Sequence, residues 1–538
     1  MNPAWSDPIV TCAEARALET RLFGGDEERE WAAMVRAGSA VARAVLEDCR
    51  EIGGFPPSGR LLVLAGKGHN GGDALLAAAA ILAGNPQASA DVVFALGERS
   101  LGPLAARAWR ELTHAASRRV KALPAREGCP QGGVGYDVCL DGIFGFQFRP
   151  PVGAAVARLL RGVNGHPHIR LRAAVDLPSG VGEESGGDAF RADFTYATGS
   201  VKTPLLQERN RAAGGRLRYL DLGFFGDSVT GVGDPGYRAP DRVLKSSILA
   251  PLAALRRSQS DKRAFGHLFV VGGSRHYPGA VFMNVRAALR SGAGLVTAFV
   301  PQSLAPAFAA RAPEAMWVGW PETPDGSLAR RGLPLLQARL ERATALAIGS
   351  GLGTEGEALA LAGEILKLAG VPAVLDADGL RPEILAAAGR GRTVCLPHAG
   401  EFKRLAGGRE AATDTLRALV GETGATVVLK GPITRIAGGA ELQPAREGSG
   451  PKPRAAVYHS FFGGPVLARG GSGDLLAGLV GGLLAQSPSE PLLAACRGVV
   501  WHGRAADLLA RDRGAVAVQT TQLLGRLSAA LRAEPDAG

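Results

Sequence analysis

The chain has 538 residues, of which 46% are hydrophobic and 21% charged, so it can bury full hydrophobic cores and is not globally disordered. Its formal charge of +11 comes from scattered arginines and only 6% of its residues are aromatic, which disfavours a polynucleotide partner and favours anionic small molecules such as nucleotides. The length predicts two large domains or three to four average ones.

The cysteines and the N-terminus indicate the cellular compartment. The cysteines are dispersed and contain no Cys-x-x-Cys pair, which disfavours a zinc site or a disulfide framework. The N-terminus has no basic segment followed by an apolar one, and no apolar run is long enough to cross a membrane. We therefore expect a soluble, cytoplasmic protein without a membrane or nucleic-acid partner, and we expect it to form a homo-oligomer.

Short β-branched runs alternate with Ala- and Leu-rich stretches, which predicts an α/β protein with mainly parallel sheets. The expected strands of the first half are 61–64, 91–95, 136–140, 171–175 and 192–197. Those of the second half are 267–271, 294–300, 345–348, 373–375, 393–396 and 426–429. A segment rich in Gly, Pro and Asp follows residue 223, so we place a first domain at 1–224, a linker at 225–243 and a second domain at 244–534.

The first expected strand runs into a glycine-rich loop, AGKGHNGGD, at residues 65–73. Gly66, Gly68 and Gly71 have the spacing of a dinucleotide-binding fingerprint, which is weak when it stands alone. Asn70 and Asp73 are the sharper signal, because they add side-chain oxygens where a pyrophosphate binder uses bare backbone.

Polar residues also follow two later strands of this half: Asp141 after one, Asp176 and Ser179 after the other. The carboxyl ends of parallel strands meet at one edge of a sheet, so Asn70, Asp141 and Ser179 could gather around an alkali ion or Mg²⁺. Asp176 would then be free to act as an acid or base. The alternative is that these residues form turns and cap helices.

The segments MVRAGSAVA, GKGHNGGD, LDGIFGFQFRP and VDLPSGV resemble the NAD(P)H-hydrate epimerase domain of the YjeF N-terminal type, over about residues 8–224. The resemblance implies a Rossmann-like three-layer fold, with potassium held by Asn70, Asp141 and Ser179 and with Asp176 as the acid/base of epimerisation. It also implies a contact surface for the hydrated nucleotide, formed by His69, Asn70, Gly71, Gly72, Asp73, Gly145, Phe146, Gln147, Phe148, Arg149, Pro150, Pro151 and Asp176.

Glycine turns follow most of the expected strands of the second half, and the last of them, Gly470-Gly471-Ser472-Gly473-Asp474, precedes an apolar run that predicts a helix. Converging backbone N–H groups and a helix N-terminus form a cradle for phosphate or an oxyanion. Asp474 in such a cradle is either the base of a phosphoryl transfer or a helix cap.

Three other residues of this half are weak signals when each is taken alone. Lys430, at the end of a strand, can reach a phosphate or lie in solvent. His398 can bind a polar head group or be structural, and Gly351 can line a site or simply form a turn.

The order FGHLFVVGGS, GSGLG, VLDADGL, LPHAGEF, VVLKGPIT and GGSGDLLAG resembles the ADP-dependent NAD(P)H-hydrate dehydratase domain, over about residues 244–534. The resemblance implies a ribokinase-like fold. It assigns the hydrated substrate to Ala280, Gly351, His398 and Asp474, and the adenine nucleotide to Lys430, Gly431, Pro432, Ile433, Thr434 and Gly473. Asp474 would deprotonate the substrate hydroxyl, which takes a phosphoryl group from ADP with Mg²⁺ as counter-charge and later leaves as phosphate.

Together the two resemblances predict a bifunctional enzyme that epimerises the R and S hydrates of NADH and NADPH and dehydrates the S form, releasing AMP and phosphate. One alternative is a ribokinase-like kinase for a small alcohol such as a vitamin precursor, with a non-catalytic nucleotide-binding first domain. Another is a scaffold that only binds nucleotides. A kinase would release a stable phosphorylated product, whereas a dehydratase regenerates the absorbance of the reduced cofactor.

Overall fold

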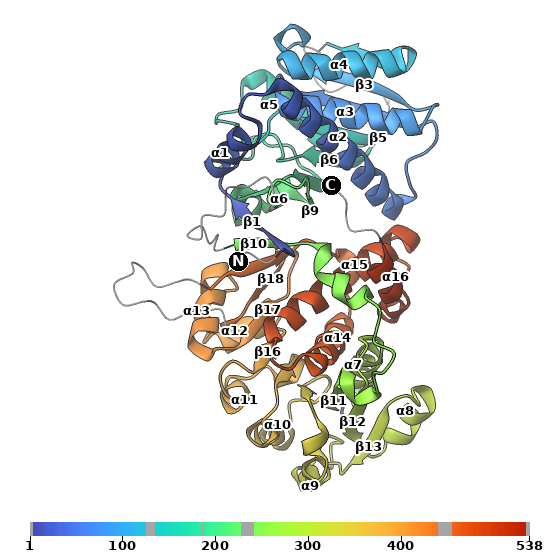
Figure 1. Ribbon diagram of the computed structural model, residues 1–538, viewed down its shortest axis with the longest axis vertical. Helices are drawn as coiled ribbons and strands as arrows, with labels where there is room; N and C mark the ends of the chain where they lie inside the picture. The colour runs from blue at the N-terminus through green and yellow to red at the C-terminus, as the bar shows by residue number, and fades with distance from the viewer. Residues whose placement is uncertain (1–3, 125–134, 185–186, 227–240, 440–454, 534–538) are drawn as a thin grey trace, which may run out of the picture.

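The computed structural model describes residues 4–124, 135–184, 187–226, 241–439 and 455–533. Two α/β bodies are stacked along the longest axis, with the first half of the chain above the second (Figure 1). Every expected strand is present, and its ends lie within two residues of the prediction. Most of the predicted linker 225–243 lies outside the described residues.

The upper sheet is parallel throughout its described strands, in the order β4-β3-β2-β5-β6-β7-β9. Its strands are β2 (Arg60–Ala65), β3 (Ser89–Phe94), β4 (Val120–Leu123), β5 (Tyr136–Gly142), β6 (Ile169–Val175), β7 (Phe194–Thr198) and β9 (Arg216–Leu220). The helices of this half are α1 (Cys12–Phe23), α2 (Glu27–Cys49), α3 (His69–Gly84), α4 (Pro103–Ala116), α5 (Ala154–Asn164) and α6 (Arg211–Gly214).

Alternating side chains of β2 divide this half into three layers. Leu61 and Val63 point into the core beneath α2, α3 and α4, whereas Leu62 and Leu64 point into the core beneath α5. All four are fully buried, as expected for a parallel strand covered by helices on both faces. The Rossmann-like three-layer prediction is confirmed.

The lower sheet has the order β13-β12-β11-β14-β15-β16-β17-β18-β19-β10-β1-β8 among the described residues. It is parallel from β13 to β17, and β18 is antiparallel to both neighbours. Its strands are β1 (Ser6–Val10), β8 (Val201–Lys202), β10 (Asp241–Leu244), β11 (His267–Val271), β12 (Leu295–Pro301), β13 (Met316–Trp320), β14 (Ala345–Ile348), β15 (Ala373–Leu375), β16 (Thr393–Cys395), β17 (Thr426–Leu429), β18 (Thr434–Ala437) and β19 (Val457–Ser460).

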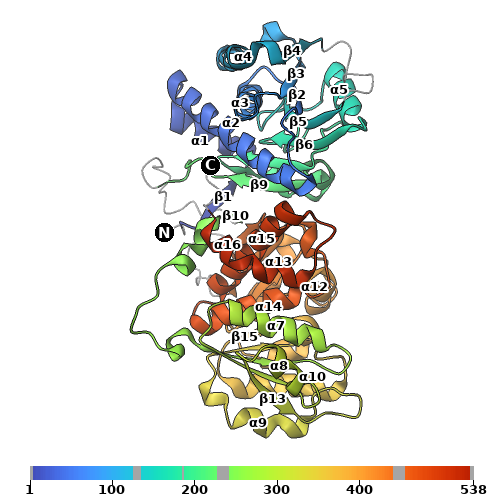
Figure 2. The ribbon, with the colours of Figure 1, turned by 90° about the vertical axis from the view of Figure 1, so that its right-hand side faces the viewer.

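Helices cover both faces of this sheet (Figure 2). The helices are α7 (Pro278–Arg290), α8 (Ala305–Arg311), α9 (Leu333–Gln337), α10 (Gly356–Ala369), α11 (Pro382–Ala387), α12 (Ala399–Leu405), α13 (Thr413–Thr423), α14 (Ser472–Gln486), α15 (Pro491–Arg513) and α16 (Leu527–Arg532). Leu268 and Val270 of β11 face the core with α7, α14 and α15, and Phe269 and Val271 face the core with α10 to α13. None of the helices that the structure describes is long and apolar enough to cross a membrane.

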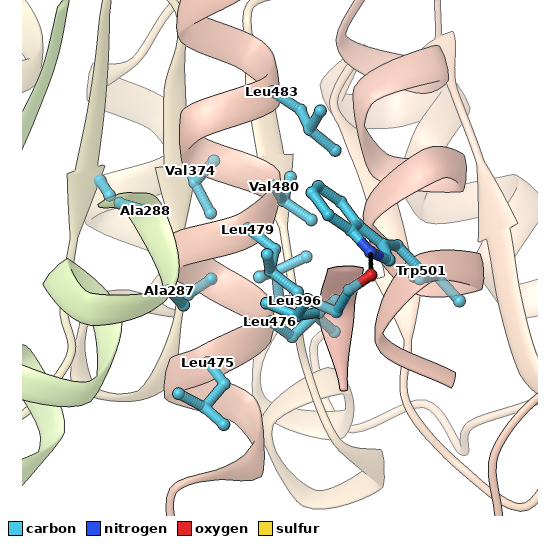
Figure 3. Close-up of a cluster of buried hydrophobic side chains, with 14 of the residues drawn as sticks. Ala287, Ala288, Val374, Leu396, Leu475, Leu476, Leu479, Val480, Leu483 and Trp501 are labelled. Carbon is cyan, nitrogen blue, oxygen red and sulfur yellow. Dashed lines mark hydrogen bonds between the residues drawn. The ribbon is translucent and has the colours of Figure 1, made fainter. Parts of the chain in front are cut away.

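Helix α14 is held on all sides, which fixes the position of its N-terminus. Its leucines and Val480 lie between α7, the sheet and Trp501 of α15, whose indole Nε1 donates to the Leu527 carbonyl at 2.8 Å (Figure 3). At Gly478, a Cβ would lie 2.0 Å from the Asn284 carbonyl oxygen, so α14 and α7 are in backbone contact. Full burial of each leucine contributes about 1.5–3 kcal/mol.

The two halves are joined because strands of the first half extend the sheet of the second half, which the sequence did not indicate. Strand β1, from the N-terminus, pairs antiparallel with β10 and parallel with β8 of the first half. Arg218 of β9 lies 3.0 Å from both Asp48 of α2 and Asp507 of α15. The first predicted domain therefore contributes strands to the sheet of the second.

Candidate active sites

A pocket of about 430 Å³ opens at the carboxyl ends of the upper sheet, and we call it the first-half pocket. Its lining includes most of the residues predicted to contact a hydrated nucleotide: His69, Asn70, Asp73, Gly145, Phe146, Gln147, Phe148, Arg149, Pro151 and Asp176. Of the other three, Gly71 and Gly72 are buried in the first turn of α3, and Pro150 is not part of the lining.

Two of the three glycines of the apparent dinucleotide fingerprint, Gly66 and Gly71, serve backbone packing. At Gly66, a Cβ would lie 1.9 Å from the Ile143 carbonyl oxygen, and at Gly71 it would lie 2.2 Å from the Gly66 carbonyl oxygen. These glycines bring the end of β2, the start of α3 and the loop after β5 into contact. They hold the lining residues of the first-half pocket together.

Asp176 is held between a lysine and a backbone amide. Its Oδ1 forms an ion pair with Lys202 Nζ, and its Oδ2 accepts from the Phe146 N–H at 3.3 Å. Both side chains of the ion pair are buried. Asp176 also has a φ of +64°, a conformation that costs a non-glycine residue about 1–3 kcal/mol and is concentrated at functional sites.

Lys202 was missed in the sequence, because an isolated lysine in the short strand β8 carries no local signature. Its Nζ also donates to the Thr198 carbonyl at 3.2 Å, which fixes its position. Removing one partner of a buried pair leaves an uncompensated charge, so Lys202 and Asp176 depend on each other for charge compensation.

Two further carboxyl groups line the first-half pocket. Burial raises the pKa of Glu19 to about 7, with Lys202 lowering it and Asp176 and Glu30 raising it. Burial, together with the nearby Asp176 and Glu19 carboxylates, raises the pKa of Asp73 well above its ordinary value. The pocket therefore combines Asp176, ion-paired with Lys202, with two carboxyl groups whose pKa is raised, an arrangement suited to acid–base chemistry.

The three residues predicted to hold a cation meet beside this pocket. Asp141 accepts from the Ser179 hydroxyl at 2.6 Å and from the Ser179 N–H at 2.7 Å. Ser179 Oγ accepts from the Phe144 N–H, and Asn70 Nδ2 donates to the Phe144 carbonyl at 3.0 Å. Asp141 is fully buried and forms no ion pair with any residue that the structure describes, so these oxygens fit a bound cation.

The second-half site lies at the N-terminus of α14. Gly471, with a φ of +86°, is the N-cap, so Ser472, Gly473 and Asp474 form the first helical turn rather than a loop before the helix. This corrects the predicted helix start at Leu475. The Ser472 N–H donates to the Arg469 carbonyl at 3.3 Å, and the N–H groups of Gly473 and Asp474 have no intrahelical partner because of their position in the first turn.

Asp474 has the environment of a base. Burial and the neighbouring Asp376 raise its pKa to about 6, against a hydrogen bond with Ser350 and the charge of Lys430. Ser350 Oγ in turn accepts from Asn284 Nδ2 of α7 at 3.1 Å, which orients the hydroxyl. Asp474 thus loses its proton below neutral pH and remains basic.

Lys430 lies across from the helix terminus. Its Nζ is 2.9 Å from Asp376 Oδ1 and 3.9 Å from Glu401 Oε2. Burial alone would lower the pKa of Lys430, but Asp376 and Glu401 outweigh it and raise the pKa. At Gly473, a Cβ would lie 3.2 Å from Lys430 Nζ and 3.5 Å from Asp376 Oδ2, so this glycine leaves room between the lysine and the helix.

Other predicted residues of the second half line up along the same sheet edge. Gly351 has a φ of +66°, and a Cβ there would lie 3.1 Å from the Ala280 Cβ and 2.5 Å from the Tyr277 carbonyl oxygen. Gly431, Pro432 and Ile433 form the turn between β17 and β18, and Thr434 begins β18. Gly351 with Ala280 on one side and the turn after β17 on the other thus come from different parts of the chain, whereas Gly473 and Asp474 are neighbours in the first turn of α14.

His398 caps a helix. Its Nδ1 accepts from the backbone N–H groups of Gly400 at 3.0 Å and Glu401 at 3.3 Å, at the start of α12. The Nε2 atom lies 3.4 Å from Glu401 Oε1, and the side chain is 62% exposed. His398 therefore has a structural role as the N-cap of α12, and a substrate would contact the exposed edge of its ring.

Two family models match the chain: the YjeF-related protein N-terminus over residues 31–204, and NAD(P)H-hydrate dehydratase over residues 268–528. The chain is 36% identical to the Bifunctional NAD(P)H-hydrate repair enzyme Nnr of Gloeobacter violaceus, over 96% of both chains. It is 34% identical to the protein of the same name from Thermosynechococcus vestitus, over 97% of both. A solved ADP/ATP-dependent NAD(P)H-hydrate dehydratase from Bacillus subtilis, co-crystallised with ATP and Mg²⁺, is 24% identical with a TM-score of 0.41, covering 52% of this chain and 93% of that one.

Proposed function

The chain belongs to the family of bifunctional NAD(P)H-hydrate repair enzymes, and we propose from this premise which residues carry each reaction. It is an enzyme of metabolite repair, with epimerase and dehydratase activities on hydrated NADH and NADPH. The first-half pocket would epimerise the R and S hydrates, and the second-half site would dehydrate the S form. The relatives do not favour the alternative of a small-alcohol kinase.

The dehydratase proposal depends most on Asp474, a carboxyl group with a pKa of about 6 on the first turn of α14. Hydration of an enamine places the hydroxyl on the carbon next to the ring nitrogen. Asp474 takes the proton of this hydroxyl, whose oxygen attacks the terminal phosphorus of ADP and displaces AMP. The nitrogen lone pair then expels phosphate, and loss of a proton from the adjacent carbon restores the double bond of the reduced ring.

Lys430 and the helix terminus would bind the nucleotide during this transfer. The Lys430 ammonium and the free N–H groups of the first turn of α14 offer positive charge to phosphate oxygens. Gly431, Pro432, Ile433 and Thr434 would hold the rest of the nucleotide, and Ala280, Gly351 and the exposed edge of His398 the hydrated ring.

The two predicted cations would be bound in different ways. Asn70, Asp141 and Ser179 would hold K⁺, which would neutralise the buried Asp141 carboxylate and order the loop after β5. Mg²⁺ would be bound mainly by the nucleotide phosphates, since no group of three or more His, Cys, Asp or Glu among the described residues is placed to hold a metal ion. When bound, it would neutralise phosphate charge. Cytoplasmic location and homo-oligomer formation stay predictions.

One experiment separates the two activities. The full chain is incubated with a mixture of R and S hydrates, ADP and Mg²⁺, and recovery of the reduced nicotinamide is followed by absorbance. Complete recovery is expected, because the first-half pocket feeds R hydrate into the S form. Recovery that stops at the S fraction would remove the epimerase assignment, and no recovery with ADP or ATP would remove the dehydratase assignment.

A further inference from the structure

Glu19 is a pocket residue that lies outside the segment shared with the epimerase family model. It stands on α1 and lines the first-half pocket, whereas the family match begins at residue 31. Its side chain is half-buried, and its carboxyl group forms no hydrogen bond or ion pair with any residue that the structure describes. A partly buried carboxyl group facing a pocket without a partner is available to a ligand.

The position of Glu19 depends on strand β1, which also joins the two halves by pairing with β8 and β10. Strand β1 pairs Val10 with Lys202, and α1 begins two residues later. The start of α1 is fixed by a capping box between Thr11 and Glu14 and by the Cys12 N–H, which donates to Glu183 Oε1 at 2.9 Å. Glu19 and Lys202 are therefore held in one framework, although they are far apart in sequence.

The charged groups around Glu19 differ from those around Asp176. Lys202 of β8 is paired with Asp176, and the other groups that face Glu19 are the carboxyl groups of Asp73 and Glu30. Glu30 in turn lies 3.5 Å from His69 Nε2. Lys202 is thus committed to Asp176, whereas the other neighbours of Glu19 are carboxyl groups, and burial raises the pKa of Glu19 to about 7.

Epimerisation at the hydrated carbon needs two such groups. The hydroxyl must leave as water from one face of the ring, and water must add to the other. An acid is required for the first event and a base for the second. Asp176 comes to the pocket from the sheet edge and Glu19 from helix α1.

We propose that Glu19 is the second proton-transfer group of the epimerase, acting with Asp176; this rests on the epimerase function proposed above. The Glu19 carboxyl donates its proton to the hydroxyl oxygen, the carbon–oxygen bond breaks, and the ring nitrogen lone pair forms a C=N⁺ bond. Water then adds to the opposite face, and its proton passes to Asp176. The reverse reaction returns the proton along the same path, so no oxidant or further reactant is needed.

The test compares Glu19→Gln, Glu19→Asp and the wild-type full chain on pure R hydrate with ADP and Mg²⁺. Glu19→Gln should slow recovery of the reduced cofactor from R hydrate by about 10²-fold or more, while dehydration of S hydrate keeps its wild-type rate. Glu19→Asp should restore part of the loss. Glu27→Gln, at an exposed carboxylate on α2, is the matched control and should leave both rates unchanged.

A pH profile provides the readout that a structural role would not change. With wild type, recovery from R hydrate should fall as pH rises through about 7, where Glu19 loses its proton, and this limb should be absent in Glu19→Gln. Wild-type rates in Glu19→Gln, or an unchanged alkaline limb, would overturn the proposal. Failure of the epimerase function itself would look different, because wild type would then recover only S hydrate.

Discussion

The two candidate active sites each contain a lysine and a carboxylate predicted to do chemistry, but the lysine has a different partner in each. In the first-half pocket, Lys202 forms a buried ion pair with Asp176, the carboxylate predicted to do chemistry. In the second-half site, Lys430 is bonded to Asp376 instead, and Asp474 is left with a hydrogen bond from Ser350 and a pKa of about 6. The partner of the lysine thus differs: it is the predicted reactive carboxylate itself in the first-half pocket and a neighbouring carboxylate in the second-half site.

This difference matches the two reactions. A phosphoryl transfer from a hydroxyl needs one base that accepts a proton and later releases it, and a cation that can approach phosphate. Lys430 is paired with Asp376 and not with Asp474, so it does not compete with the substrate for the predicted base. An epimerisation that exchanges the faces of a ring needs both an acid and a base, and the first-half pocket offers more than one carboxyl group.

The largest expected effect comes from replacing Asp474, the proposed base of the second-half site. Asp474→Asn keeps the shape and can still accept the Ser350 hydrogen bond, but it cannot take a proton, so ADP-dependent dehydration of S hydrate should fall by about 10³-fold. ADP binding measured by calorimetry should be largely retained. Asp325→Asn, at an exposed site, is the control, and near-normal turnover in Asp474→Asn would mean that another group is the base.

Lys202→Met tests the other half of the comparison. It leaves the Asp176 carboxylate buried without its cation, so epimerisation should fall by about 10²-fold and the free energy of unfolding by about 3–5 kcal/mol. Denaturant unfolding and recovery from R hydrate measure the two effects, with the exposed Lys121→Met as the control. If epimerisation were unchanged in a folded Lys202→Met protein, the ion pair between Lys202 and Asp176 would not be needed for the reaction.

A smaller effect is expected at Gly473. A methyl group there would approach Lys430 Nζ to 3.2 Å and occupy the space offered to phosphate, so Gly473→Ala should raise the KM for ADP by about 10-fold. Gly470→Ala, three residues earlier, places its methyl group in open space and serves as the control. Equal KM values for the two variants would place the phosphates elsewhere.

Much of this architecture could be predicted, because buried parallel strands are continuous apolar runs with glycine turns after them. The strands His267–Val271, Ala345–Ile348 and Thr426–Leu429 begin and end where the sequence placed them. The same reasoning predicted that Asn70, Asp141 and Ser179 lie at one edge of the sheet.

The features that were missed arise only from tertiary contacts. Strands β1 and β10 are short and contain Asp, Arg and Pro, residues that are uncommon in strands. Their sequences therefore predict loops, and they become strands only through pairing with neighbouring strands. Lys202 and Glu19 lie far from the glycine loops in sequence and reach the pocket only because β1 pairs with β8. A fused sheet between two domains leaves no periodic signal in either of them.

The smallest expected effect is a pH limb that distinguishes the two sites. Asp474 works as a base only when ionised, and burial raises its pKa to about 6, so kcat/KM for dehydration should fall about tenfold per pH unit below 6 and be level above it. The first-half pocket should behave in the opposite sense, losing activity as pH rises through about 7. Rates measured on pure S and pure R hydrates between pH 5 and 8 would show the two limbs, and parallel profiles would mean that the carboxylates of the two sites are tuned alike.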